Sequence, residues 1–225
     1  MIEPSDGAPP DSGMTLVEVL VAMGLFGVLA SILLGLGLST QAVTEDTRDR
    51  TGVNEEARIA MERIAREVRQ SAGLDSVTLP GTPAGHTSTS FTFWTDFNND
   101  GARTNTASDP EVMTYEWDPD TEELSMTAVT GLATVTRPVL AATVTSFVVE
   151  PRSSRWQYDQ VGGACSCADG ITTWRELDNS AVGNYNSEPD PQELRFADLL
   201  FVSMTVEDGN GTQTYSTQID LRNRS

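Results

Sequence analysis

The chain has 225 residues, with 14 arginines, no lysine and a formal net charge of -19 at pH 7. A surface this acidic repels the phosphates of nucleic acids, which excludes nucleic-acid binding by the bulk of the protein. Two cysteines are too few for a scaffold built on disulfide bonds. Beside a long N-terminal helix, the length leaves room for one globular domain of about 150 residues.

The N-terminal part of the sequence divides into a polar leader and an apolar stretch. Residues 1–13 are rich in proline, glycine and acidic residues, and this composition predicts a disordered leader peptide. Residues 14–38 are predominantly apolar and carry one charged residue, Glu18. At a rise of about 1.5 Å per residue, a helix of this length crosses the hydrocarbon core of a bilayer. The sequence therefore predicts a transmembrane helix over residues 14–38.

Glu18 is the chemically unusual residue of this stretch. A carboxylate in an apolar helix costs on the order of a few kcal/mol in lipid unless it finds a partner. A cut between Gly13 and Met14 would create a cationic amine at the membrane edge. Glu18 of one copy can then pair with the Met14 amine of a neighbouring copy, whereas an unpaired copy is penalised. We hypothesise that Glu18 favours assembly of copies through this helix.

The junction G-M-T-L-V-E and the apolar run after it resemble the leader junction of type IV prepilins and of type II secretion pseudopilins. The resemblance implies that a prepilin peptidase cuts after Gly13 and methylates the new N-terminus at Met14. It also implies that Glu18 is the family's assembly glutamate. The implied partners are other pilin or pseudopilin subunits, the prepilin peptidase and an inner-membrane assembly platform. The alternative is an ordinary signal-anchor helix that carries one glutamate.

Residues 39–73 are predicted to continue the helix with an amphipathic pattern. Apolar residues recur there at three- and four-residue steps, at Ala57, Met61, Ile64 and Val68. Glutamate and arginine residues occupy the opposite face, and Gly73 is expected to end the helix. Residues 61–72 resemble the end of this helix in minor pilins of the pseudopilin-J type.

After residue 73 the apolar residues alternate with polar ones, which predicts β-strands. The predicted strands are residues 76–79, 91–95, 112–117, 124–129, 144–150, 199–206 and 214–221. An antiparallel sheet with one face against the helix gives an α+β fold, and the resemblance implies a type IV pilin-like architecture. Residues 74–225 would then form a β-rich globular domain outside the inner membrane, with the N-terminus in the cytoplasm.

The segment D-F-N-N-D-G at residues 96–101 matches the opening of a calcium-binding loop. The candidate ligands are Asp96, Asn98 and Asp100. The distal glutamate of such a loop is absent because Ala107 stands at its position, although Asp109 and Glu111 are near. The alternative is a turn rich in asparagine and aspartate after a strand. Calcium is the one cofactor that the sequence suggests.

Cys165 and Cys167 are separated by a single residue. Outside the cytoplasm two thiols tend to oxidise. A bridge across one residue is strained, because the Cα separation lies near the upper end of the allowed range. Three interpretations are open: a strained local disulfide, two free thiols, or a bond to a partner.

Residues 152–195 are predicted to form a long loop, and loops of this length are usually functional or disordered. Four aromatic residues are scattered through it, at Trp156, Tyr158, Trp174 and Tyr185. These rings either contact a partner, as exposed aromatics often do, or pack down as a satellite core.

No sequence motif of catalysis is present, and His86 is the single histidine. We therefore do not expect an enzyme. From the resemblance we expect a minor pilin-like structural subunit of a type IV pilus that primes assembly or lies at the filament tip. The alternatives are a pseudopilin of a type II secretion system and, from another class, a membrane-anchored binding domain that never assembles, for example a calcium-dependent adhesin.

Overall fold

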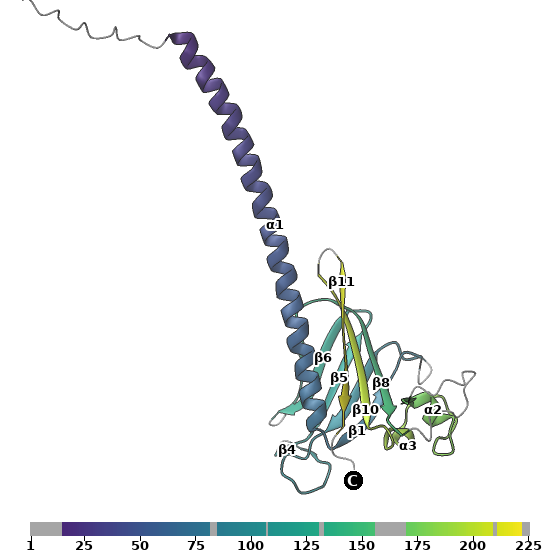
Figure 1. Ribbon diagram of the computed structural model, residues 1–225. Helices are drawn as coiled ribbons and strands as arrows, with labels where there is room; N and C mark the ends of the chain where they lie inside the picture. The colour runs from purple at the N-terminus through teal and green to yellow at the C-terminus, as the bar shows by residue number, and fades with distance from the viewer. Residues whose placement is uncertain are drawn as a thin grey trace, which may run out of the picture. The chain divides into compact units, whose positions relative to one another are not determined.

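The computed structural model describes residues 15–81, 85–106, 108–130, 133–155, 170–208 and 211–221. The chain divides into two compact units, Met1–Arg48 and Asp49–Ser225. Helix α1 (Leu16–Gln70) begins in the first unit and ends in the second (Figure 1).

In the first unit the described residues from Leu16 onward are all helical. Three threonines follow the apolar stretch, Thr40, Thr44 and Thr47. The hydroxyl of each donates a hydrogen bond to the backbone carbonyl four residues earlier. Thr40 Oγ1 donates to Leu36 O at 2.9 Å, and Thr44 Oγ1 donates to Thr40 O at 2.8 Å. These bonds satisfy the hydroxyl groups within the helix, so the threonines interrupt neither the helix nor its apolar surroundings.

The C-terminal end of α1 comes earlier than predicted, at Gln70 instead of residue 73. Ser71 Oγ donates to Val68 O at 2.7 Å, and the backbone N–H of Ala72 donates to Trp94 O at 2.8 Å. The backbone groups after Gln70 are therefore taken by a tight turn and by the sheet. Gly73 is the first residue of a strand and lies opposite Trp94.

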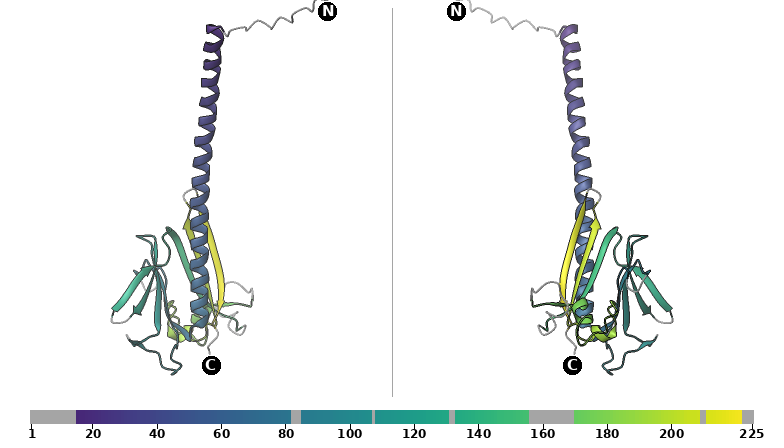
Figure 2. Two further views of the ribbon diagram at one scale, coloured as in Figure 1. Left: turned by 90° about the vertical axis from the view of Figure 1, so that its left-hand side faces the viewer. Right: turned by 90° about the vertical axis from the view of Figure 1, so that its right-hand side faces the viewer.

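The described residues of the second unit form two larger antiparallel sheets and one small hairpin. The first sheet has the spatial order β1 (Gly73–Thr78), β2 (Thr89–Trp94), β5 (Val112–Asp118), β6 (Glu123–Thr130) and β7 (Ala133–Pro138). The second has the order β11 (Thr212–Asp220), β10 (Leu199–Glu207), β8 (Val144–Ser153) and β9 (Thr172–Thr173). The small hairpin pairs β3 (Asn105–Thr106) with β4 (Asp109–Pro110). In both views of Figure 2 the two larger sheets form distinct layers beside the last turns of α1.

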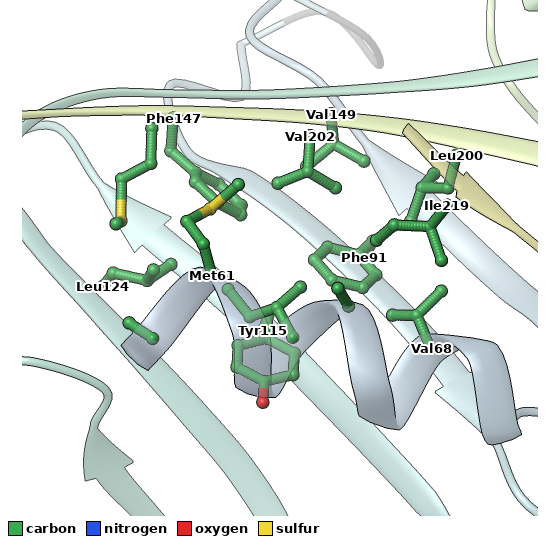
Figure 3. Close-up of a cluster of buried hydrophobic side chains, with 14 of the residues drawn as sticks. Met61, Val68, Phe91, Tyr115, Leu124, Phe147, Val149, Leu200, Val202 and Ile219 are labelled. Carbon is green, nitrogen blue, oxygen red and sulfur yellow. The ribbon is translucent and has the colours of Figure 1, made fainter. Parts of the chain in front are cut away.

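The core of the second unit joins the apolar face of α1 to both sheets. The apolar residues predicted at three- and four-residue steps form one buried stripe of α1, which confirms the prediction. Ala57, Ile64 and Val68 are fully buried, and Met61 is 6% exposed. Figure 3 shows Met61 and Val68 pointing toward side chains of both sheets. The residues of β2 alternate between buried and half-buried along the strand, which places every second side chain in this core.

Stacked aromatic rings fill the part of the core that the first sheet supplies. The ring centroids of Phe91 and Tyr115 lie 5.4 Å apart, and those of Phe91 and Phe147 lie 6.3 Å apart. Phe147 belongs to β8, so the rings connect the two sheets. Such contacts add to the hydrophobic gain from burying the rings.

The predicted α+β class with an antiparallel β-domain is confirmed: one long N-terminal helix packs with antiparallel sheets. Strand β7 was not predicted; five of its six side chains are exposed and none is buried, so it has no buried face. As an edge strand it tolerates Pro138 at its end.

The segment 152–195 is not one irregular loop. It contains the end of β8, strand β9 and two short helices, α2 (Trp174–Asp178) and α3 (Pro191–Leu194). Both helices begin at a capping box, formed by Thr173 with Glu176 and by Asp190 with Glu193. They are too short for helical periodicity to show in the sequence, although the capping boxes are sequence signals.

Candidate functional site

The first turn of α1 carries the acidic residue that the sequence singled out. Thr15 receives the backbone N–H of Glu18 at its carbonyl oxygen, at 3.0 Å, and at its Oγ1, at 3.3 Å. The Thr15 hydroxyl therefore caps the helix. The Glu18 side chain is exposed, and at the N-terminal end the helix dipole favours its negative charge. Gly13 and Met14 lie outside the described residues.

From residue 19 to residue 38 the surface of α1 is predominantly apolar. Residues 19–44 contain no charged side chain. The large apolar residues of this stretch are exposed, among them Phe26 at 72% and Leu34 at 69%. Within the described part of the chain, α1 is the one helix long and apolar enough to cross a membrane. A contiguous apolar surface of this extent indicates contact with lipid or with other helices.

Small residues shape one side of this apolar surface. Val19, Ala22, Met23, Phe26 and Gly27 line a shallow apolar groove. A Cβ added at Gly27 would meet no atom within 4 Å, so the glycine fills no packing role inside the chain. Small residues at such positions let another helix approach closely.

Residues 10–34 match the family model described as the prokaryotic N-terminal methylation motif. The motif covers the predicted cleavage junction, Glu18 and the greater part of the apolar stretch. No curated protein and no solved structure matches the chain. Together, the methylation motif and the apolar helix support membrane anchoring and prepilin-type processing of this protein.

The acidic loop predicted from D-F-N-N-D-G follows β2 directly. Asp96 accepts two backbone N–H groups, from Asp100 to Oδ1 at 3.1 Å and from Gly101 to Oδ2 at 2.9 Å. Asp100 Oδ1 accepts the N–H of Ala102 at 2.7 Å. Gly101 has a φ of 73°, which explains the glycine at this turn. The backbone thus orients both carboxylates.

Asn98 does not present its oxygen alongside these carboxylates. Its Oδ1 accepts the N–H of Asp100 at 2.8 Å, and its Nδ2 donates to Asp100 Oδ2 at 2.9 Å and to Asp109 Oδ2 at 2.8 Å. In this structure Asn98 is therefore a residue that positions the neighbouring carboxylates.

Glu111 joins the acidic loop from the other side. One carboxylate oxygen of each of Asp96, Asp100 and Glu111 lies within 4.8 Å of the other two. Strands β2 and β5 pair with Trp94 opposite Val112, and the N–H of Thr95 donates to Glu111 O at 2.9 Å. The strand register therefore brings Glu111 beside the residue that follows β2. In the sequence, the signal for this contact is an acidic residue directly before β5, the strand that pairs with β2.

The remaining predictions from the sequence concern the two cysteines and the four aromatic residues of segment 152–195. Cys165, Cys167, Trp156 and Tyr158 lie outside the described residues. Trp174 is 3% exposed and packs as a satellite core, as one interpretation expected. Tyr185 is 66% exposed, as the other interpretation requires.

Two carboxyl groups at α3 have coupled protonation. Burial, together with the hydrogen bond with the Asp190 side chain, raises the pKa of Glu193 to about 7. The same hydrogen bond lowers the pKa of Asp190, which also accepts the Gln192 N–H at 2.8 Å. Below about pH 7, Asp190 therefore holds the negative charge while Glu193 holds the proton.

Proposed function

We propose that the protein is a minor pilin-like structural subunit of a type IV pilus, which primes assembly or lies at the filament tip. The observation that carries the proposal is the methylation motif at residues 10–34 on an exposed apolar helix with one acidic side chain. This combination is what a subunit needs to reside in a membrane first and in a helical filament afterwards.

In the proposed mechanism, the prepilin peptidase cuts after Gly13 and methylates the amine of Met14. The new N-terminus carries a positive charge four residues before Glu18 in the sequence. In lipid the two charges of a single copy are costly, and pairing between neighbouring copies removes that cost. The predominantly apolar surface of residues 19–38 then packs against other helices instead of lipid.

The acidity of the chain favours a low copy number. Cleavage after Gly13 removes Glu3, Asp6 and Asp11, so the net charge becomes -19 + 3 = -16. Subunits of this charge repel one another when they are adjacent in a filament. A few copies at the tip, next to other subunits, avoid that repulsion.

The first test is the mass of the mature N-terminus in membranes that contain an active prepilin peptidase. We expect a chain that begins with methylated Met14. Gly13→Leu should keep the whole leader, because the residue before the cut is replaced, whereas Gly7→Leu in the same leader should be processed normally. An uncut wild-type chain in the presence of active peptidase would contradict the proposal and would favour the non-assembling anchored domain.

The alternative within the same machinery is a pseudopilin of a type II secretion system. Deleting the gene in its native host separates the two. A minor pilin predicts loss of surface pili with secretion intact, and a pseudopilin predicts the reverse.

A further inference from the structure

The acidic loop after β2 contains a buried carboxylate oxygen without a partner. Glu111 is fully buried. Its Oε2 accepts the N–H of Thr104 at 2.9 Å, whereas its Oε1 accepts no hydrogen bond from any described residue. Burying a charged oxygen away from water is costly unless a cation or a donor meets it.

Asp96 and Asp100 add two more negative charges at the same place. One oxygen of each lies within 4.8 Å of the other and of a Glu111 oxygen. Three carboxylates this close repel one another, and the repulsion is strong where water is excluded. In the part of the chain that is described, no arginine pairs with any of the three; the nearby Arg103 is paired with Asp75 at 2.6 Å.

We propose that Asp96, Asp100 and Glu111 bind one calcium ion. The donor set consists of carboxylate oxygens, which hard divalent cations prefer over zinc or copper. Calcium accepts irregular sets of six to eight oxygens, so water can complete its shell, whereas magnesium demands a near-ideal octahedron. The buried Oε1 of Glu111 is the contact that an exposed acidic turn would lack.

Binding would tie the β2–β3 connection to the start of β5. Asp96 and Asp100 belong to the connection, and Glu111 is followed directly by the first residue of β5. The ion would replace the mutual repulsion of the carboxylates with a shared attraction. The inference does not depend on the proposed pilin role, because it rests only on the second unit.

The test is calorimetric titration and thermal unfolding of the full chain in detergent, after treatment with a chelator. We expect calcium to bind with a dissociation constant on the order of 10⁻⁴–10⁻³ M, typical of extracellular modules. At 10 mM calcium, Tm should rise by roughly 3–10 °C. Magnesium at the same concentration should raise Tm much less.

Glu111→Gln should weaken calcium binding at least tenfold without lowering Tm in the absence of calcium, because it removes one of three repelling charges. The matched control is Glu116→Gln, an exposed site on β5 that loses the same charge, and its affinity should be unchanged. Asp100→Asn is a second variant, which decides the matter if Glu111→Gln does not fold. Two results would overturn the proposal: no calcium-dependent rise in wild-type Tm, or a rise that Glu111→Gln and Asp100→Asn both retain.

Discussion

Three glutamates, Glu18, Glu111 and Glu193, place a carboxyl group where a negative charge is costly, either in lipid or in the protein interior. Glu18 stands on a helix surface that is otherwise uncharged up to Glu45. Glu111 and Glu193 are fully buried, and each has an Oε1 without a partner among the described residues. Burial makes Glu111 and Glu193 costly in the folded chain, whereas Glu18 is costly only in lipid. We propose that a neighbouring subunit relieves Glu18 and that a cation relieves Glu111, while a proton relieves Glu193.

For Glu18, we expect substitution by alanine to leave membrane insertion intact and to lower incorporation into filaments. Removing the carboxylate makes the helix more apolar, so insertion loses nothing. It also removes the attraction to the Met14 amine of the next copy. The measurement is the ratio of filament-bound to membrane-bound protein, with Glu45→Ala as the control. Normal incorporation of Glu18→Ala would remove the charge-pairing argument.

For Glu193, we expect folding stability to fall as the pH rises from about 5 to 8. The pKa of this buried carboxyl is raised from 4.5 to about 7, so the folded state holds the proton more tightly than the unfolded chain does. The stability contributed by this proton is complete below pH 4.5 and is lost as the pH passes 7.

The size of this loss is on the order of 1–3 kcal/mol. Glu193→Gln, which is neutral at every pH, should remove that part of the pH dependence and be more stable than wild type at pH 8. Denaturant unfolding at several pH values measures it, with the exposed Glu123→Gln as the control. A wild-type slope retained by Glu193→Gln would show that another group causes it.

At the scale of elements, α1 has two kinds of apolar surface. In residues 19–44 the apolar side chains are exposed all round, whereas in the second unit they form one buried stripe. A polar contact also joins α1 to β5, because Tyr115 Oη donates to Glu67 Oε2 at 2.5 Å. Within the helix, Arg63 Nε donates to Glu67 Oε1 at 2.8 Å. Burial of its ring and the hydrogen bond to Glu67 both raise the pKa of Tyr115, which stays protonated.

The stripe predicts a contrast between two isoleucines of the same helix. Ile64 is fully buried, and Ile59 is 55% exposed. Ile64→Ala should lower the free energy of unfolding by about 2–5 kcal/mol, because it leaves a cavity between the helix and the sheets. Ile59→Ala should change it by less than about 0.5 kcal/mol. Equal losses for the two variants, measured by chemical denaturation, would refute this packing.

At the scale of the whole molecule, the chain combines a helix long and apolar enough to cross a membrane with an acidic β-domain. Residues 15–38 of the first unit supply an apolar helix surface with one charged residue, Glu18, and the second unit supplies a core built on α1 and two sheets. The proposed assembly uses the first, and the proposed calcium site belongs to the second. The two proposals can therefore fail independently.

Local patterns in the sequence were enough to predict α1, its acidic first turn, its buried stripe and the seven predicted strands, each within a few residues. These features repeat every two, three or four residues, so they are visible without knowledge of distant contacts. The elements that were missed are the strands β3, β4, β7 and β9 and the helices α2 and α3. Strands of two residues and helices of four or five residues are too short to show a period, and β7 has no buried face.

The place of Glu111 in the acidic loop required the folded chain. The calcium-loop pattern covers residues 96–101 and identifies Asp96 and Asp100, but Glu111 reaches them through the register of β2 against β5. A strand register depends on which residues of both strands pack into the core, and a shift of one residue would turn Glu111 to the other face. Periodicity along one segment contains no such information, since the choice is made by packing between segments.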